Sequence, residues 1–221
     1  MTLRTAATFI VWNVCPIRDS RAAYFLACLC CALLSCSTQP PRKEVAPARH
    51  PLLDYAFTNE LGQPVTLGQL RGKALALTFI FTRCPNPDFC PRLSKNFQEA
   101  AAKLRATPNA PTNWHFLSVS FDTEYDTPAV LKAYARQYEY DPAHWSFLTG
   151  PPEKIAELAR LNDVNFDREG GFYNHNFRTL IIDPQGDLRM IFPITGDISD
   201  DIAAEILKAL NHSVPSPARD K

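Results

Sequence analysis

The sequence predicts an α/β domain in which helices flank a central mixed sheet. Short apolar runs rich in β-branched and aromatic residues alternate with stretches in which apolar side chains recur at helical spacing. Such alternation is typical of crossover helices packed on a largely parallel sheet. The 221 residues are 46% hydrophobic and 21% charged, a composition that allows a buried core.

The first half of the domain is predicted to contain four strands and one helix. Leu61-Gly62 is a turn signal between two short strands. The continuous apolar run 74–81 predicts a buried central strand, and 115–121 predicts the next strand. Between these two strands, from Pro91 onward, apolar residues fall at helical spacing: Leu93, Phe97, Ala100, Ala101 and Leu104.

Two further helices are predicted on either side of a short strand at 146–150. Asp126 or Thr127 is suited to cap the first helix, because Pro128 follows in its first turn. Apolar residues mark one face of each helix: Val130, Leu131, Tyr134 and Tyr138 in the first, and Ile155, Leu158 and Leu161 in the second.

The last part of the domain is predicted to be a hairpin followed by a helix. Residues 177–194 form two strands joined by a turn at 183–186, and Ser199 caps the final helix. The inward residues of this helix are Ile202, Ile206, Leu207 and Leu210. The order of all these elements is that of a thioredoxin-like fold.

The N-terminal residues 1–36 read as a signal peptide. The apolar run "AAYFLACLCCALLSC" is short for a bilayer span and ends in "LLSC", which resembles a bacterial lipobox with Cys36 as the lipidated residue. A retained membrane anchor is the alternative. We expect an exported lipoprotein, anchored in a membrane and facing the periplasm or the extracellular side. Residues 37–50 are then a linker, 51–212 the domain and 213–221 a flexible tail.

Charge and cysteine content narrow the function classes. Basic and acidic side chains number 23 each, so the sequence gives no sign of a nucleic-acid-binding surface. Five of the seven cysteines lie in the first 36 residues, which leaves Cys84 and Cys90 as the thiols of the domain. Outside the cytoplasm a disulfide between them could persist.

Cys84 and Cys90 stand at the junction of a strand and a helix. Cys84 follows the strand 74–81, at the edge where α/β sheets place their sites. Cys90 precedes Pro91 and lies close to the predicted N-cap, where backbone N–H groups favour a thiolate. Both positions indicate reactive sulfur.

Three uses of this cysteine pair remain open: a structural disulfide, thiol–disulfide exchange and a soft-metal site. A disulfide across so short a loop would constrain the unfolded chain only modestly. The position at the strand–helix junction also argues against a purely structural disulfide. Structural zinc sites need four ligands, with cysteines usually two to four residues apart, whereas five residues separate this pair. Two thiolates and one imidazole suit Cu(I) better.

His175 is the candidate for the imidazole. It follows Gly170-Gly171 on a loop that leads into the hairpin, where a thioredoxin-like fold brings a loop beside the cysteine turn. The other four histidines are expected in the linker, at the start of the tail or in packed, hydrogen-bonded positions: His50, His212, His115 and His144.

Four stretches carry a family resemblance: "FIFTRCPNPDFCPRL", "SVSFDTEYDTPAVLKAYA", "WSFLTG" and "YNHNFRTLIIDPQGDLR". They resemble the SCO/SenC family, thioredoxin-like copper-binding proteins that assist assembly of the binuclear copper centre of cytochrome c oxidase. The resemblance covers about residues 52–210. The usual family loop has three residues between its cysteines, so Asn86-Pro87 looks like a two-residue insertion.

By position, the resemblance implies that Cys84, Cys90 and His175 bind copper, as Cu(I) or Cu(II), and that Asp88 and Asp122 support the site. It implies a metallochaperone that passes copper to the copper-bearing subunit of cytochrome c oxidase or to another copper or thiol protein. The alternative is a thiol–disulfide oxidoreductase in which the two cysteines form a redox pair and reduce partner cysteines without stable copper binding.

Overall fold

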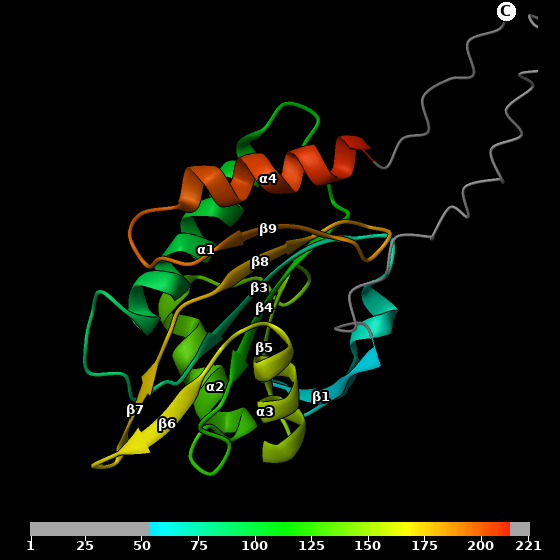
Figure 1. Cartoon of the computed structure of the whole chain (residues 1–221). Helices are drawn as coiled ribbons and strands as arrows, with labels where there is room; N and C mark the ends of the chain where they lie inside the picture. The colour runs from blue at the N-terminus through cyan, green and yellow to red at the C-terminus, as the bar shows by residue number, and fades with distance from the viewer. Residues whose placement is uncertain (1–53, 213–221) are drawn as a thin grey trace, which may run out of the picture. The chain divides into compact units, whose positions relative to one another are not determined.

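The structure is a computed structural model that describes residues 54–212 (Figure 1). The predicted signal peptide with Cys36, the predicted linker with His50 and the predicted tail lie outside the described residues. Among the helices of residues 54–212, none is long and apolar enough to cross a bilayer.

The core of the domain is a seven-stranded mixed sheet with the strand order β2-β1-β5-β4-β3-β8-β9. The three middle strands β5, β4 and β3 are parallel, and the outer strands pair antiparallel. This confirms the predicted mixed sheet. The strands are β1 (Ala56–Asn59), β2 (Pro64–Thr66), β3 (Ala74–Ile80), β4 (Trp114–Ser120), β5 (Trp145–Thr149), β8 (Thr179–Ile182) and β9 (Leu188–Phe192).

Strands β3 and β4 form the buried centre of the sheet, as the continuous apolar run predicted. Every residue of both strands is buried. A strand with neighbours on both edges and packing on both faces has no solvent-facing side, which explains its lack of polar alternation. Both strands end at the same edge of the sheet, so the segments that follow them lie close together there.

In residues 54–212, four α-helices flank the sheet, as their arrangement in Figure 1 shows. Phe97 and Tyr134, from the first and second helix, pack edge-on against Trp145 and Phe147 of β5. The fourth helix packs against the first helix and against β3 and β8. The helices are α1 (Cys90–Ala106), α2 (Pro128–Ala135), α3 (Pro152–Leu161) and α4 (Ser199–His212), with short 3-10 turns η2 (Leu67–Leu70) and η3 (Arg136–Tyr138).

The helix ends agree with the sequence in one case and differ in two. Thr127 caps α2, because its side chain accepts the backbone N–H of Val130. Ser199 does not cap α4 as predicted: it is the first helical residue, and its N–H and hydroxyl both donate to Oδ1 of Asp197. Leu161, predicted on the apolar face of its helix, is 43% exposed at the last position of α3.

A second, two-stranded sheet was not predicted. It consists of β6 (Phe166–Glu169) and β7 (Phe172–His175), joined at Gly170 and Gly171, which have φ of +57° and +91°. The prediction that His175 lies on a loop is therefore wrong, because His175 is the last residue of a strand, paired with Phe166. The glycines form a tight hairpin turn that requires left-handed φ angles.

Candidate functional site

The site lies at the carboxyl edge of the parallel strands, where three separate segments meet. Cys84 lies in the loop between β3 and α1, Cys90 is the first residue of α1, and His175 ends β7. The Sγ atom of Cys90 is 3.6 Å from Nε2 of His175, although the two residues are 85 positions apart. The fold thus brings together a thiol and an imidazole that the sequence had only suggested as partners.

The tautomer of His175 follows from its second nitrogen. Nδ1 lies 3.0 Å from the carbonyl oxygen of Asn176. Because a carbonyl oxygen only accepts, Nδ1 carries the hydrogen and Nε2 has a free lone pair on the side of Cys90. A backbone contact of this kind is how proteins commonly fix a metal-binding histidine.

Aromatic rings enclose the imidazole of His175. Phe121 and Phe177 lie 4.9 Å and 4.8 Å from it, centroid to centroid, and Phe81 lies 6.0 Å away, all with the rings steeply inclined. Burial in this apolar shell lowers the pKa of His175 below its usual value. The ring is therefore held in its neutral, electron-donating form near neutral pH.

The two thiols are not equivalent, and their order reverses the prediction. A hydrogen bond from Cys90 lowers the pKa of Cys84 to about 6, with further help from the backbone N–H groups of Cys90 and Asn86. The same contact, together with burial, raises the pKa of Cys90. The pKa order therefore favours Cys84 as the thiolate and Cys90 as the proton donor, because the contact with Cys84 and burial outweigh the backbone N–H groups that favour a Cys90 thiolate.

Both cysteines are free thiols in the structure, Cys90 buried and Cys84 half-buried. In its thiol form Cys84 lies 3.7 Å from the carbonyl oxygen of Asn86. The side chain of Asn86 also accepts the backbone N–H of Asp88, which tightens the loop into a turn. Cys84 is therefore the more accessible of these two thiols.

Asp122 supports the site through an arginine that the sequence analysis did not single out. Its carboxylate is fully buried and accepts two hydrogen bonds from Arg83, at 2.9 Å and 2.6 Å. The guanidinium also lies 4.2 Å over the ring of Tyr125. Arg83 directly precedes Cys84, so this ion pair fixes the start of the cysteine loop against the end of β4.

Asp126 holds the same loop from a second point. It accepts the backbone N–H and the hydroxyl of Thr82 and also the hydroxyl of Ser120. Burial raises the pKa of this carboxyl. The two aspartates of the "DTEYD" stretch therefore act on the residues just before Cys84 rather than on the sulfur atoms themselves.

The side chain of Asp88 does not support the site as expected. The residue is exposed, and its contact in the loop is made by its backbone N–H. Within residues 54–212, no three His, Cys, Asp or Glu side chains are gathered closely enough to hold a metal ion. The three predicted ligands meet in pairs, Cys84 with Cys90 and Cys90 with His175.

Two other histidines of the described chain, His115 and His144, have structural roles, as predicted. His212, expected at the start of the tail, is the last residue of α4. His115 is buried, with Nε2 2.9 Å from Oγ of Ser146. His144 stacks on Trp114 at 4.3 Å. Neither is near the cysteine loop, and each is held by partners that account for its presence.

The residues that the sequence analysis missed are the aromatic shell and Arg83. Phe81 and Phe121 directly follow β3 and β4, so their positions at the ends of the predicted strands were a usable signal. Phe89 contacts Phe177, with ring centroids 5.0 Å apart and the rings tilted, and no periodic pattern indicates that contact. Such ring contacts depend on segments that only the folded topology brings together.

The chain matches known proteins over most of its length. The SCO1/SenC family model matches residues 45–211. The SCO1 protein homolog of Bacillus subtilis (strain 168) is 27% identical over 145 residues, a match that covers 66% of this chain and 66% of the relative, just under two thirds of its length.

Solved structures show the same fold. A SCO1/SenC family lipoprotein from Bacillus anthracis str. Ames aligns with a TM-score of 0.65 and 26% identity, over 75% of this chain and 98% of that one. BsSco, a member of the Sco family of cytochrome c oxidase assembly proteins in which a disulfide switch was identified, aligns with a TM-score of 0.63 and 26% identity, over 75% of this chain and 96% of that one. Bradyrhizobium japonicum ScoI with copper bound gives 0.57 and 27%, over 71% and 97%. These matches confirm the predicted thioredoxin-like fold, and the extent of the family match shows that the chain belongs to the SCO1/SenC family.

Proposed function

We propose that this protein is a copper metallochaperone that carries copper on Cys84, Cys90 and His175. The observation that carries the proposal is the 3.6 Å contact between Sγ of Cys90 and the lone-pair nitrogen of His175. The lowered pKa of Cys84, caused mainly by its interaction with Cys90, supports the inclusion of the second thiol. Cys90 lies between the other two donors, so a small closure of Cys84 and His175 toward it would complete a three-donor set.

The chemistry of these donors suits Cu(I). Two sulfur atoms and one neutral imidazole nitrogen are soft to intermediate ligands, and a d¹⁰ ion accepts low coordination numbers. The nearby carboxylate that could compete, Asp122, is occupied by Arg83. The aromatic shell limits water around the nitrogen.

Cargo transfer requires one ligand that a partner can reach. Cys84 is half-buried and its pKa is low, so its sulfur exchanges partners without first losing a proton. We propose that a client's sulfur or nitrogen ligands replace Cys84 first and Cys90 last. The copper-bearing subunit of cytochrome c oxidase, or another copper or thiol protein, is the proposed client, supported by the description of BsSco as an oxidase assembly protein and by the copper in Bradyrhizobium japonicum ScoI.

The proposed location is outside the cytoplasm, on a membrane held by the lipid on Cys36. The sequence pattern that ends at Cys36 supports this placement, as does the similarity to a SCO1/SenC family lipoprotein. Lipidation of Cys36 by intact-mass measurement on membrane-extracted protein tests it, and an unmodified Cys36 in a retained N-terminus would contradict it.

An anaerobic Cu(I) titration against a competing chelator tests the function. The first 36 residues contain five more cysteines, so the stoichiometry is taken as the difference between the full chain and its Cys84→Ser/Cys90→Ser variant. We expect a difference of about one equivalent, and a clear loss of affinity in His175→Ala but not in His144→Ala. No difference between the chain and the double variant would remove the proposal.

A second candidate function is favoured by the unequal thiols. As a reductase, the Cys84 thiolate would attack a client disulfide, form a mixed disulfide and release one client thiolate; Cys90 would then attack Cys84 and release the second. Two electrons pass from the dithiol to the client. Cys90→Ala should trap the mixed disulfide with a model disulfide, and failure to trap it would exclude this function.

A further inference from the structure

Three aromatic rings enclose His175, but they are not equally fixed. Phe81 and Phe121 are 2% and 4% exposed and belong to the core. Their ring centroids are 5.5 Å apart, and the ring of Tyr173 lies 5.4 Å from Phe81 and 5.0 Å from Phe121. Two of the three walls around the imidazole are therefore immobile parts of the packed domain.

The third wall is Phe177, which is only partly buried. Its ring lies 4.8 Å from the imidazole of His175 and 5.0 Å from the ring of Phe89. Phe177 therefore stands between the imidazole and a ring that comes from the cysteine loop.

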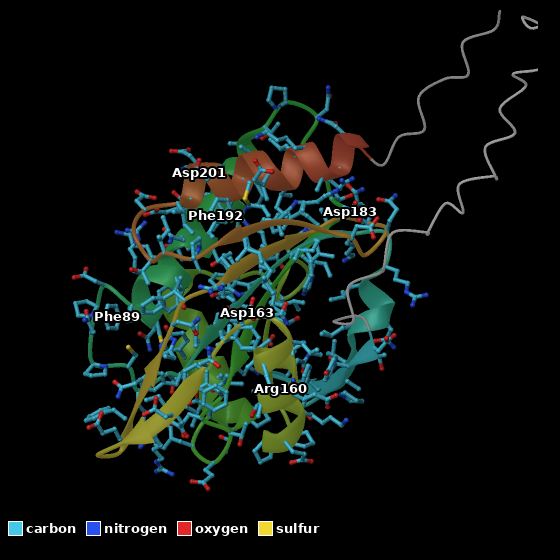
Figure 2. All side chains as sticks on the ribbon, viewed as in Figure 1. Phe89, Arg160, Asp163, Asp183, Phe192 and Asp201 are labelled. Carbon is cyan, nitrogen blue, oxygen red and sulfur yellow. The ribbon has the colours of Figure 1, made fainter. Side chains whose placement is uncertain are left out.

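Phe89 is the outermost of these three rings, His175, Phe177 and Phe89. It is 39% exposed and directly precedes Cys90, in the loop before α1, and Figure 2 labels it. A single contact between two aromatic rings is weak, enough to bias the position of the neighbouring ring and too little to lock it.

We propose that Phe89 is a positioning residue that holds Phe177 against His175 and so closes the solvent side of the thiol–imidazole site. The pair ties the cysteine loop to the segment after β7. Displacement of Phe89 frees Phe177 and exposes Nε2 of His175. A docking partner that lifts the Phe89 ring would therefore open the site at the moment of contact.

The closure is tested without copper by measuring how fast diethyl pyrocarbonate modifies His175 in the full chain, read by mass spectrometry of the peptide that contains it. Nδ1 is hydrogen-bonded to Asn176, so the reagent reports on access to Nε2. We expect Phe89→Ala to accelerate modification at least about fivefold, and Phe89→Leu, which keeps apolar bulk, to stay within about twofold of the unmodified sequence. Truncation of so exposed a ring does not threaten folding.

Phe172→Ala is the matched control. Phe172 is a more exposed phenylalanine, at 49%, three residues before His175 on the same strand, and no ring contact joins it to His175 in the described chain. Its removal should leave the rate within about twofold. An unchanged rate in Phe89→Ala, or an equal acceleration in Phe172→Ala, would overturn the proposal.

The consequence for copper rests on the proposed function and is measured separately. In Phe89→Ala, Cu(I) should pass to an added chelator at least about fivefold faster, while the stoichiometry stays the same. If the chain binds no copper, the proposed function fails, and the modification rates still decide whether Phe89 closes the site. Faster modification of His175 with an unchanged rate of copper release would overturn the claim that Phe89 slows the release of bound copper.

Discussion

Replacing Cys90 by alanine isolates the hydrogen bond that makes Cys84 a thiolate. In the unaltered protein this bond is the largest cause of the lowered pKa of Cys84, about 6. Without it the thiol keeps the two backbone N–H contacts and its partial burial, which act in opposite directions. We expect the pKa to return to about 8.5, the ordinary value of a cysteine.

The magnitude determines which observable is informative. At pH 7 a thiol with a pKa of about 6 is about nine-tenths ionised, whereas one with a pKa of about 8.5 is about 3% ionised. A thiolate of lower pKa is also intrinsically less nucleophilic, by about tenfold over this interval. The two effects leave a difference of about threefold in the rate at pH 7. The rate at one pH is therefore a poor test, and the midpoint of the pH–rate profile is a good one.

The assay is alkylation of Cys84 by iodoacetamide across the pH range, quantified on the peptide that contains it. We expect a midpoint near 6 in the unaltered protein and at about 8.5 in Cys90→Ala. Cys90→Ser keeps a hydroxyl donor and should give an intermediate midpoint. Equal midpoints in the unaltered protein and Cys90→Ala would refute the assignment of Cys90 as the donor.

Three further predictions concern the structure around the site. Asp122→Asn should lower the free energy of unfolding by about 1–3 kcal/mol in urea titrations, because it removes the buried carboxylate that pairs with Arg83, whereas Glu124→Gln at an exposed ion pair should change it by less than about 1 kcal/mol. Burial lowers the pKa of His115 to about 4, so the unfolded chain binds more protons between that pH and about 6.5. Stability should therefore fall by about 3 kcal/mol more in the unaltered protein than in His115→Gln as the pH drops through this window, and parallel curves would contradict the burial argument. Gly171→Ala should destabilise the β6–β7 hairpin by about 1–2 kcal/mol because its φ is +91°, while Gly196→Ala, with open space around it, should be nearly neutral in thermal unfolding.

The main sheet could be predicted because its signals are local and strong. The runs that became β3 and β4 are continuously apolar, and such runs have few stable places other than the middle of a sheet. The β6–β7 hairpin escaped prediction because β6 has three exposed residues of four and no apolar alternation. Its strands are defined by pairing and by the glycine turn, and the sequence displays only the turn.

The proximity of Cys90 and His175 was predictable from the sequence, but the electrostatics of the two thiols were not. The strand-end position of Cys84 and the hairpin-side position of His175 followed from the order of elements. The choice of Cys84 as thiolate did not, because it depends on a hydrogen bond across the loop and on the burial of Cys90, which are properties of the folded packing. The contact between Phe89 and Phe177 was not predictable for the same reason, because it too depends on the folded packing.

The central claim is that copper is bound by two sulfur atoms and one histidine nitrogen of this site. X-ray absorption at the copper edge on the Cu(I)-loaded full chain, corrected by the Cys84→Ser/Cys90→Ser variant, measures that ligand set directly. The account predicts two sulfur neighbours and one nitrogen neighbour, with the nitrogen lost in His175→Ala. A shell of sulfur alone in the unaltered protein, or a nitrogen that survives in His175→Ala, would contradict it.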